Sequence, residues 1–84
     1  MYDQTKLENK VILVTGGAGA IGSNLTRALS SLGAEKVIVL DDLSASYEWN
    51  IPNEPNVLFI EGSMTDDRIL KRAFHEKPTH IFHL

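Results

Sequence analysis

The sequence contains no cysteine, which excludes disulfides, thiolate zinc sites and cysteine nucleophiles and fits a reducing compartment, so a cytoplasmic location is expected. Long apolar runs are also missing: the longest cover four residues, as in Val11–Val14, so no membrane span is expected. Basic charge is scarce, with 8 Lys and Arg against 11 Asp and Glu, which argues against a nucleic-acid partner. Residues 1–9 are polar, lack the apolar stretch of a secretory signal, and are predicted to be a loose lead-in.

What the sequence does contain is an alternation of short β-branched runs and amphipathic stretches. Each run is continuously apolar, as in parallel strands buried on both faces, and the predicted strands cover residues 10–15, 36–41, 57–61 and 80–84. A helix from about residue 20, stopped by Gly33, is expected to bury Ile21, Leu25, Ala28, Leu29 and Leu32. A second helix, capped by Thr65 and ended by Pro78, is expected to bury Ile69, Leu70, Ala73 and Phe74.

The alternation predicts an α/β fold of the Rossmann-like, doubly wound kind, with a parallel sheet in the strand order 3-2-1-4. The last predicted strand, 80–84, has no covering helix after it, although parallel strands are normally covered on both faces. We therefore expect residues 10–84 to be the N-terminal part of a larger domain. A complete natural mini-domain is the alternative.

A glycine-rich segment joins the first predicted strand to the first helix, and it reads Thr15-Gly16-Gly17-Ala18-Gly19-Ala20-Ile21-Gly22. It matches the dinucleotide fingerprint in two registers, starting at Gly17 or, with wider spacing, at Gly16. Such glycines allow a sharp turn, a close backbone approach to a pyrophosphate and tight helix packing, while the first helical amides bind the phosphates. The alternative is a plain tight turn; a P-loop is excluded because no Gly-Lys-Ser/Thr follows.

Asp41 closes the second predicted strand, where an acid can accept both hydroxyls of an adenosine ribose. The same carboxylate would repel a 2′-phosphate, and residues 37–56 contain no Lys or Arg to bind one. The sequence therefore favours NAD over NADP as the cofactor. The alternative for Asp41 is an Asx turn at the strand end, and Asp42 fits a turn residue better than a ligand.

Four segments in this order resemble the start of an extended short-chain dehydrogenase/reductase of the NAD-dependent epimerase/dehydratase type, a family that acts on nucleotide sugars: residues 15–23, 39–43, 61–66 and 81–84. The resemblance implies a pyrophosphate site at Gly16, Gly19, Ala20, Ile21 and Gly22. It implies a ribose contact at Asp41 and an adenine site at Ser63 and Met64, although the family usually has Asp in place of Ser63. Asp42 and Ser46 complete the predicted cofactor-binding set, Ser46 through a loop that makes variable cofactor and subunit contacts. Tyr47 and Trp49 of that loop could cover the adenosine or pack onto the domain.

No catalytic or metal-binding residue is predicted in these 84 residues. Tyr2-x-x-x-Lys6 matches the family's catalytic pair literally, but it precedes the first strand and is rejected, and His80 and His83 face opposite sides of a strand. The resemblance implies that the intact protein is an oxidoreductase, isomerase or lyase that binds NAD and a nucleotide-sugar substrate and forms a homo-oligomer, a dimer. Two alternatives remain: a stand-alone, non-catalytic nucleotide-binding module, or another Rossmann class such as a flavoprotein or methyltransferase.

Overall fold

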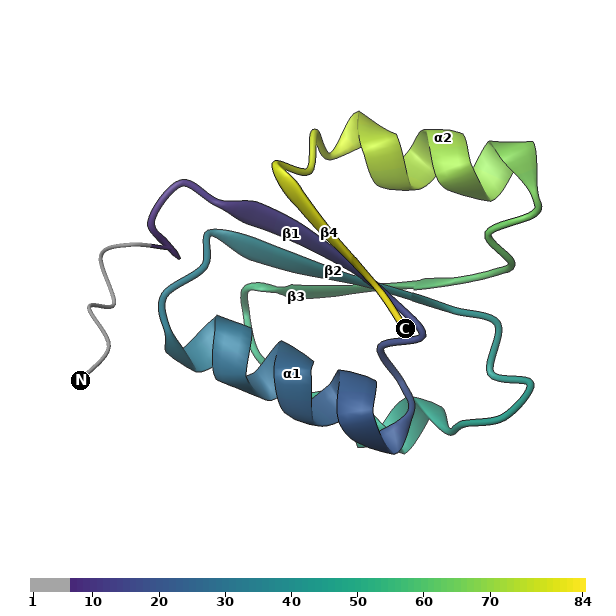
Figure 1. The fold of residues 1–84 in the computed structure, drawn as a ribbon, viewed down its shortest axis with the longest axis horizontal. Coiled ribbons are helices and arrows are strands. Elements are labelled where there is room, and N and C mark those ends of the chain that lie inside the picture. The colour runs from purple at the N-terminus through teal and green to yellow at the C-terminus, as the bar shows by residue number, and fades with distance from the viewer. Residues whose placement is uncertain (1–6) are drawn as a thin grey trace.

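A computed structural model describes residues 7–84, so most of the predicted lead-in, together with Tyr2 and Lys6, lies outside the described residues. The chain alternates strands and helices from end to end (Figure 1). The strands are β1 (Val11–Thr15), β2 (Lys36–Asp41), β3 (Val57–Glu61) and β4 (His80–His83). The helices are α1 (Ala20–Ser31), the short 3-10 helix η2 (Glu48–Asn50) and α2 (Asp67–His75).

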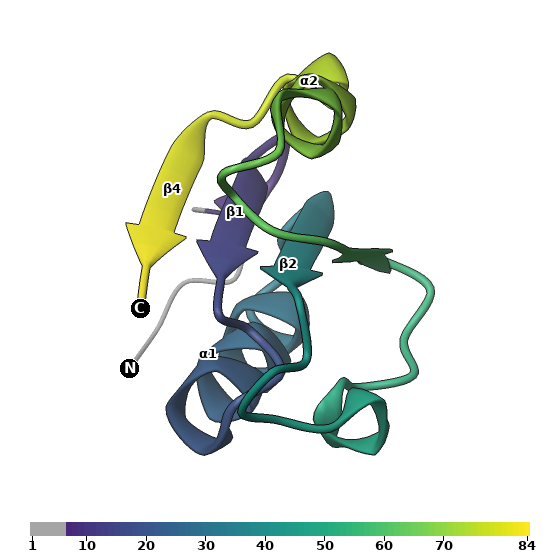
Figure 2. The ribbon, with the colours of Figure 1, turned by 90° about the vertical axis from the view of Figure 1, so that its right-hand side faces the viewer.

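The four strands form one parallel sheet in the order β3-β2-β1-β4, which confirms the predicted topology. α1 covers one face of the sheet and α2 the other, as a doubly wound fold requires (Figure 1). Because all strands are parallel, their carboxyl ends lie at the same edge of the sheet (Figure 2). The glycine segment, Asp41 and the segment after β3 therefore meet at that edge, where such folds bind ligands.

Alternation along β1 and β2 divides the core into two layers. Val11 and Leu13 face α2, in a cluster completed by Ile38, Leu40, Ile60 and Ala73. Ile12 and Val14 face α1, in a cluster completed by Leu29, Ala34 and Val37. Both central strands are therefore buried on two faces, as their unbroken apolar runs predicted.

The buried face of α1 differs from the prediction. Ile21 is 76% exposed and Ala28 is also exposed, while Leu25 and Leu32 are only partly buried. The residues that face the sheet are small or polar, namely Gly22, Ser23 and Thr26, joined by Leu29. At its start the helix approaches the glycine segment so closely that only a small residue fits at Gly22. The prediction is confirmed for Leu29, and Leu25 packs against the same cluster, but it is wrong for Ile21 and Ala28.

Smaller corrections concern α2 and the loops. The N-cap is Asp66 and not Thr65, because the Asp66 carboxylate accepts a 2.9 Å hydrogen bond from the Arg68 amide. α2 ends at His75, ahead of Pro78, and Phe74 is 49% exposed while Ala73 is fully buried. The segment between β2 and β3 contains the short helix η2.

β4 pairs with β1 along one edge, and all of its side chains are exposed. Ile81 and Phe82 are 53% and 41% exposed although they lie on opposite faces of the strand. Among residues 7–84, no helix combines the length and the apolar character needed to cross a bilayer.

Candidate functional site

The turn after β1 depends on two glycines. Gly16 has φ +74°, in the left-handed region that favours glycine, and its amide donates a 2.8 Å hydrogen bond to the Leu40 carbonyl. At Gly22, an added Cβ would lie 2.3 Å from the Gly16 oxygen and 2.6 Å from the Gly17 Cα. Gly22 is therefore required by the packing of α1 on the turn, independently of any ligand.

Gly19 is different, because the protein itself leaves room for a side chain there. An added Cβ would meet nothing closer than the Gly16 oxygen at 3.6 Å, which is ordinary van der Waals contact. Gly19 is the N-cap of α1, and no side chain caps the helix. The amides of Ala20, Ile21 and Gly22 begin the helix, and first-turn amides have no acceptor within their own helix. Backbone donors and the positive end of the helix dipole together favour an anion at this point.

Asp41 connects the glycine turn to the end of β2. Its Oδ2 accepts hydrogen bonds from the Ala18 amide and the Ser46 hydroxyl, both at 3.0 Å. Its Oδ1 accepts one from the Leu43 amide at 2.8 Å, which is the Asx turn considered as the alternative role. A carboxylate offers about four lone-pair sites. Three are used within the described residues, so the Asx turn leaves one acceptor site on Oδ1.

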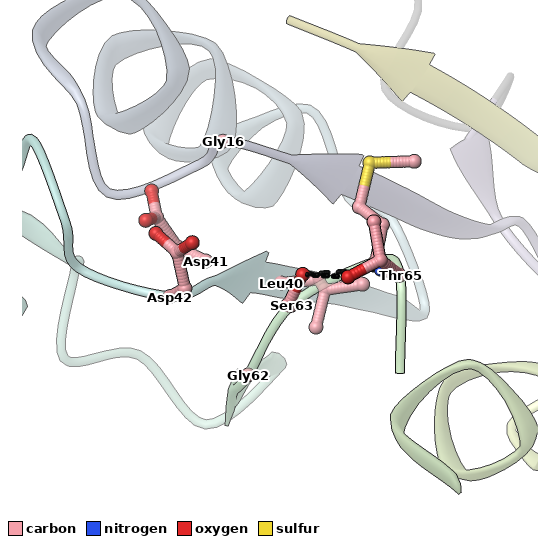
Figure 3. Close-up of a pocket in the computed structure, with 8 residues that line it drawn as sticks. Gly16, Leu40, Asp41, Asp42, Gly62, Ser63 and Thr65 are labelled. Atoms are coloured by element: carbon pink, nitrogen blue, oxygen red, sulfur yellow. Dashed lines mark hydrogen bonds between the residues drawn. The ribbon is translucent and has the colours of Figure 1, made fainter. Parts of the chain in front are cut away.

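A cavity of about 280 Å³ lies beside Asp41, at the carboxyl end of the sheet (Figure 3). It is lined by Gly16, Leu40, Asp41, Asp42, Gly62, Ser63, Met64 and Thr65. Small-molecule sites usually measure about 300–1,000 Å³. The cavity therefore suits one part of a dinucleotide, such as a nucleoside, and not a whole one.

Two further polar groups line this cavity. Asp42 accepts a 2.9 Å hydrogen bond from the Ser44 amide, and this bond holds the pKa of its carboxyl below the ordinary value. The Ser63 hydroxyl lies 2.7 Å from that of Thr65 and accepts from the Thr65 amide at 3.1 Å. The lining thus offers carboxylates and hydroxyls but no cation, a set that suits neutral hydroxyl and amino groups better than a phosphate.

The structure brings together only part of the predicted cofactor-binding set. Five members line the cavity, namely Gly16, Asp41, Asp42, Ser63 and Met64. Ser46 reaches it only through Asp41, and Gly19, Ala20, Ile21 and Gly22 lie at the start of α1, outside the lining. The sequence analysis did not predict three further lining residues, Leu40, Gly62 and Thr65. They lie at or just after the ends of β2 and β3, so the predicted topology could have placed them at the site.

The aromatic side chains after β2 lie outside the lining of this cavity and are largely exposed. Tyr47 and Trp49 stack on each other, with ring centroids 4.3 Å apart and planes 8° from parallel. They are 58% and 77% exposed. Packing onto the domain is therefore wrong for Trp49, whereas the covering of the adenosine stays a prediction.

The histidines offer no metal centre. His83 Nδ1 lies 2.7 Å from the Thr15 hydroxyl, so it ties β4 to β1. Within residues 7–84, no group of three or more His, Cys, Asp or Glu side chains could hold a metal ion.

The comparisons with known proteins agree on one family. A sequence model of the NAD dependent epimerase/dehydratase family matches residues 12–84. UDP-glucose 4-epimerase of Streptococcus mutans is 36% identical over 67 residues, which are 80% of this chain and 20% of that enzyme. The structure of epimerase Mth375 from Methanothermobacter thermautotrophicus superposes with a TM-score of 0.91 and 52% identity, over 98% of this chain and 24% of that one.

A second solved structure, the Bordetella bronchiseptica enzyme WbmF in complex with NAD+ and UDP, gives a TM-score of 0.84 and 41% identity. It covers 95% of this chain and 24% of the enzyme. The chain therefore spans about a fifth to a quarter of the length of these relatives. On the match to the family model and this agreement in sequence and fold, the chain belongs to the NAD-dependent epimerase/dehydratase family.

Proposed function

We propose that residues 10–84 bind the ADP moiety of NAD, as the N-terminal part of a larger dinucleotide-binding domain. The observation that carries this proposal is the position of Asp41, whose carboxylate lies in the cavity wall and also holds the Ala18 amide of the glycine turn. A ribose at Asp41 and a pyrophosphate at the turn would thus be neighbours, as they are in ADP. The bare faces of β4 support the larger domain, because further elements would cover Ile81 and Phe82.

The pyrophosphate would lie at the start of α1. Its charge would meet the amides of Ala20, Ile21 and Gly22 and the positive end of the helix, so no lysine is needed. Gly19 supports this placement. The protein itself leaves space for a side chain there, so the absence of one is explained by a phosphate that approaches the backbone closely.

The ribose and adenine would occupy the cavity. Asp41 Oδ1 has a free lone-pair site, whereas Oδ2 already accepts two hydrogen bonds. To accept both ribose hydroxyls, the carboxylate would give up one internal bond, and the Ser46 hydroxyl is the only one of its donors that can rotate away. Ser63 and Met64 would flank the adenine, with the Ser63 oxygen able to accept from its amino group.

The charges in the cavity wall support NAD over NADP. A 2′-phosphate would stand next to the carboxylates of Asp41 and Asp42, and the lining contains no Lys, Arg or His to offset them. The hydrogen bond from the Ser44 amide lowers the pKa of Asp42, because it stabilises the charged form of that carboxyl. Placing like charges next to each other in an interface typically weakens binding by roughly several kcal/mol.

For the intact protein, we propose an oxidoreductase, isomerase or lyase that acts on a nucleotide sugar. Its relatives include epimerases, and a further relative, the enzyme WbmF, is crystallised with both NAD+ and UDP. When bound, NAD would supply a reversible hydride acceptor, and the residues described here would fix its adenosine end. A homodimer and a cytoplasmic location are part of the same proposal and rest on the sequence and the family resemblance.

Calorimetric titration of the intact protein with NAD, ADP and S-adenosylmethionine tests the proposal. We expect NAD and ADP to bind and S-adenosylmethionine not to bind. Replacing Asp41 by Ala should weaken both nucleotides, because the ribose acceptor is lost. Preferential binding of S-adenosylmethionine, or unchanged NAD affinity in Asp41→Ala, would contradict it; NAD binding without turnover of any nucleotide sugar would favour a non-catalytic module.

A further inference from the structure

A side chain of η2 makes a contact with the glycine turn that the proposed cofactor site does not include. The Asn50 Nδ2 atom donates a 3.1 Å hydrogen bond to the carbonyl oxygen of Ala18, which lies 32 residues earlier in the chain. Ala18 is fully buried, and its amide is already held by Asp41. Both backbone groups of this residue are therefore bound by side chains, the amide by Asp41 at the end of β2 and the carbonyl by Asn50 in the segment after it.

This contact fixes the peptide group that comes immediately before α1. In a planar trans peptide the carbonyl and the following N–H point in opposite directions, so holding the Ala18 oxygen also orients the Gly19 amide. That amide points to the Gly16 oxygen at 3.3 Å, which closes the turn. The next amides in the chain, those of Ala20 and Ile21, are the phosphate donors of the proposed function.

The conformation around Asn50 is itself well supported. The Asn50 amide donates to the Tyr47 carbonyl at 3.1 Å and the Ile51 amide to the Glu48 carbonyl at 3.0 Å, which makes the short turn of η2. The rings of Tyr47 and Trp49, which flank Glu48 in the same turn, stack on each other. The long segment after β2 thus folds back and presents one amide group to the glycine turn.

We propose that Asn50 is a positioning residue for the pyrophosphate site: it holds the Ala18–Gly19 peptide so that the first amides of α1 face the phosphates. The inference rests on the proposed NAD site, and it gives the β2–β3 segment a role that requires no contact with the cofactor. Asp41 holds the same residue, Ala18, through its backbone amide.

The test compares variants of two asparagines in the same segment. Asn50→Ala removes the donor, and Asn50→Asp replaces it with an acceptor facing the Ala18 carbonyl. The control is Asn53→Asp, which makes the same change of charge at an exposed position. NAD and adenosine affinities of the intact protein are measured by titration well below the melting temperature, which is recorded for each variant.

We expect both Asn50 variants to weaken NAD by roughly fivefold or more, the value of one hydrogen bond, while adenosine, which has no phosphate, binds as in the wild type. Asn53→Asp should bind both ligands normally. The inference would be overturned if the Asn50 variants bound NAD as tightly as Asn53→Asp does. It would also be overturned if they lost affinity for adenosine and NAD equally, because a general loss of structure predicts that result. In either case, NAD binding by the wild-type protein would leave the proposed function intact. A wild-type protein that binds neither ligand would overturn both.

Discussion

Replacing Gly19 by Ala separates what the fold needs from what a ligand needs. The added Cβ meets no atom closer than 3.6 Å, and the backbone at Gly19 has φ −75° and ψ 175°, which alanine adopts freely. Losing glycine at an N-cap costs about 0.5–1 kcal/mol, and the stiffer unfolded chain offsets about 0.4–1 kcal/mol of this. We therefore expect the free energy of unfolding to change by less than about 0.5 kcal/mol.

The same methyl group should strongly impair NAD binding. It would stand where the pyrophosphate approaches the start of α1 and would displace it from one or two backbone amides. Each charge-assisted hydrogen bond contributes about 1.5–3 kcal/mol, so the affinity should fall by roughly 10- to 100-fold or more. Calorimetry of NAD binding and a thermal melt of the same sample measure both quantities.

Gly22→Ala is the matched contrast. Its Cβ would lie 2.3 Å from the Gly16 oxygen, so the turn or the helix must move, and we expect a loss of about 1–3 kcal/mol in stability together with the loss of NAD binding. A Gly19→Ala protein that melts and binds NAD like the wild type would refute the reasoning, because no phosphate could then approach that backbone.

Three further predictions follow from single contacts. Among the described residues, Thr26 carries a fully buried hydroxyl with no hydrogen-bond partner, so Thr26→Val should raise the free energy of unfolding by about 1 kcal/mol in a denaturant titration; a loss of stability would reveal a hidden partner. The hydrogen bond from Lys36 lowers the pKa of Glu76 below its ordinary value of 4.5, so this pair stabilises the fold above that pH and the contribution is lost as the pH falls through the lowered value. Glu76→Gln should therefore flatten the acid limb of the stability–pH curve and leave its slope near neutral pH unchanged; an unaltered acid limb would contradict this. Ser63→Asp should tighten ADP binding by roughly two- to tenfold, because a carboxylate accepts more strongly from the adenine amino group; weaker binding would place the adenine elsewhere.

The fold was predictable because its determinants are local. The apolar runs at β1 and β2 mark strands buried on two faces, whereas β3 has the same kind of run but lies at an edge of the sheet and is only partly buried. The alternation with helices then leaves few topologies. The observed bounds differ from the prediction by at most one residue in each strand. The error at α1 has a physical cause: apolar periodicity assigns the buried face to the largest side chains, whereas close packing at Gly22 and Ser23 selects the smallest.

The candidate site was predictable only in part. Asp41 could be placed in it because β1 and β2 are parallel neighbours, so the end of β2 lies beside the glycine turn that follows β1. The contact between Asn50 and Ala18, which are 32 residues apart in the chain, could not be predicted, because it depends on how the segment after β2 folds back to the glycine turn, and no periodicity encodes that path. The stacking of Tyr47 on Trp49 likewise depends on the turn of η2.

In the proposed site, the end of β2 receives the adenosine ribose of NAD beside a glycine turn that receives the pyrophosphate. The most direct test of this arrangement is a titration of the intact protein with NAD and NADP under identical conditions. Because the 2′-phosphate would meet Asp41 and Asp42 with no cation in the cavity wall, we predict that NAD binds at least about 100-fold more tightly. Equal affinity for the two, or a preference for NADP, would contradict the account.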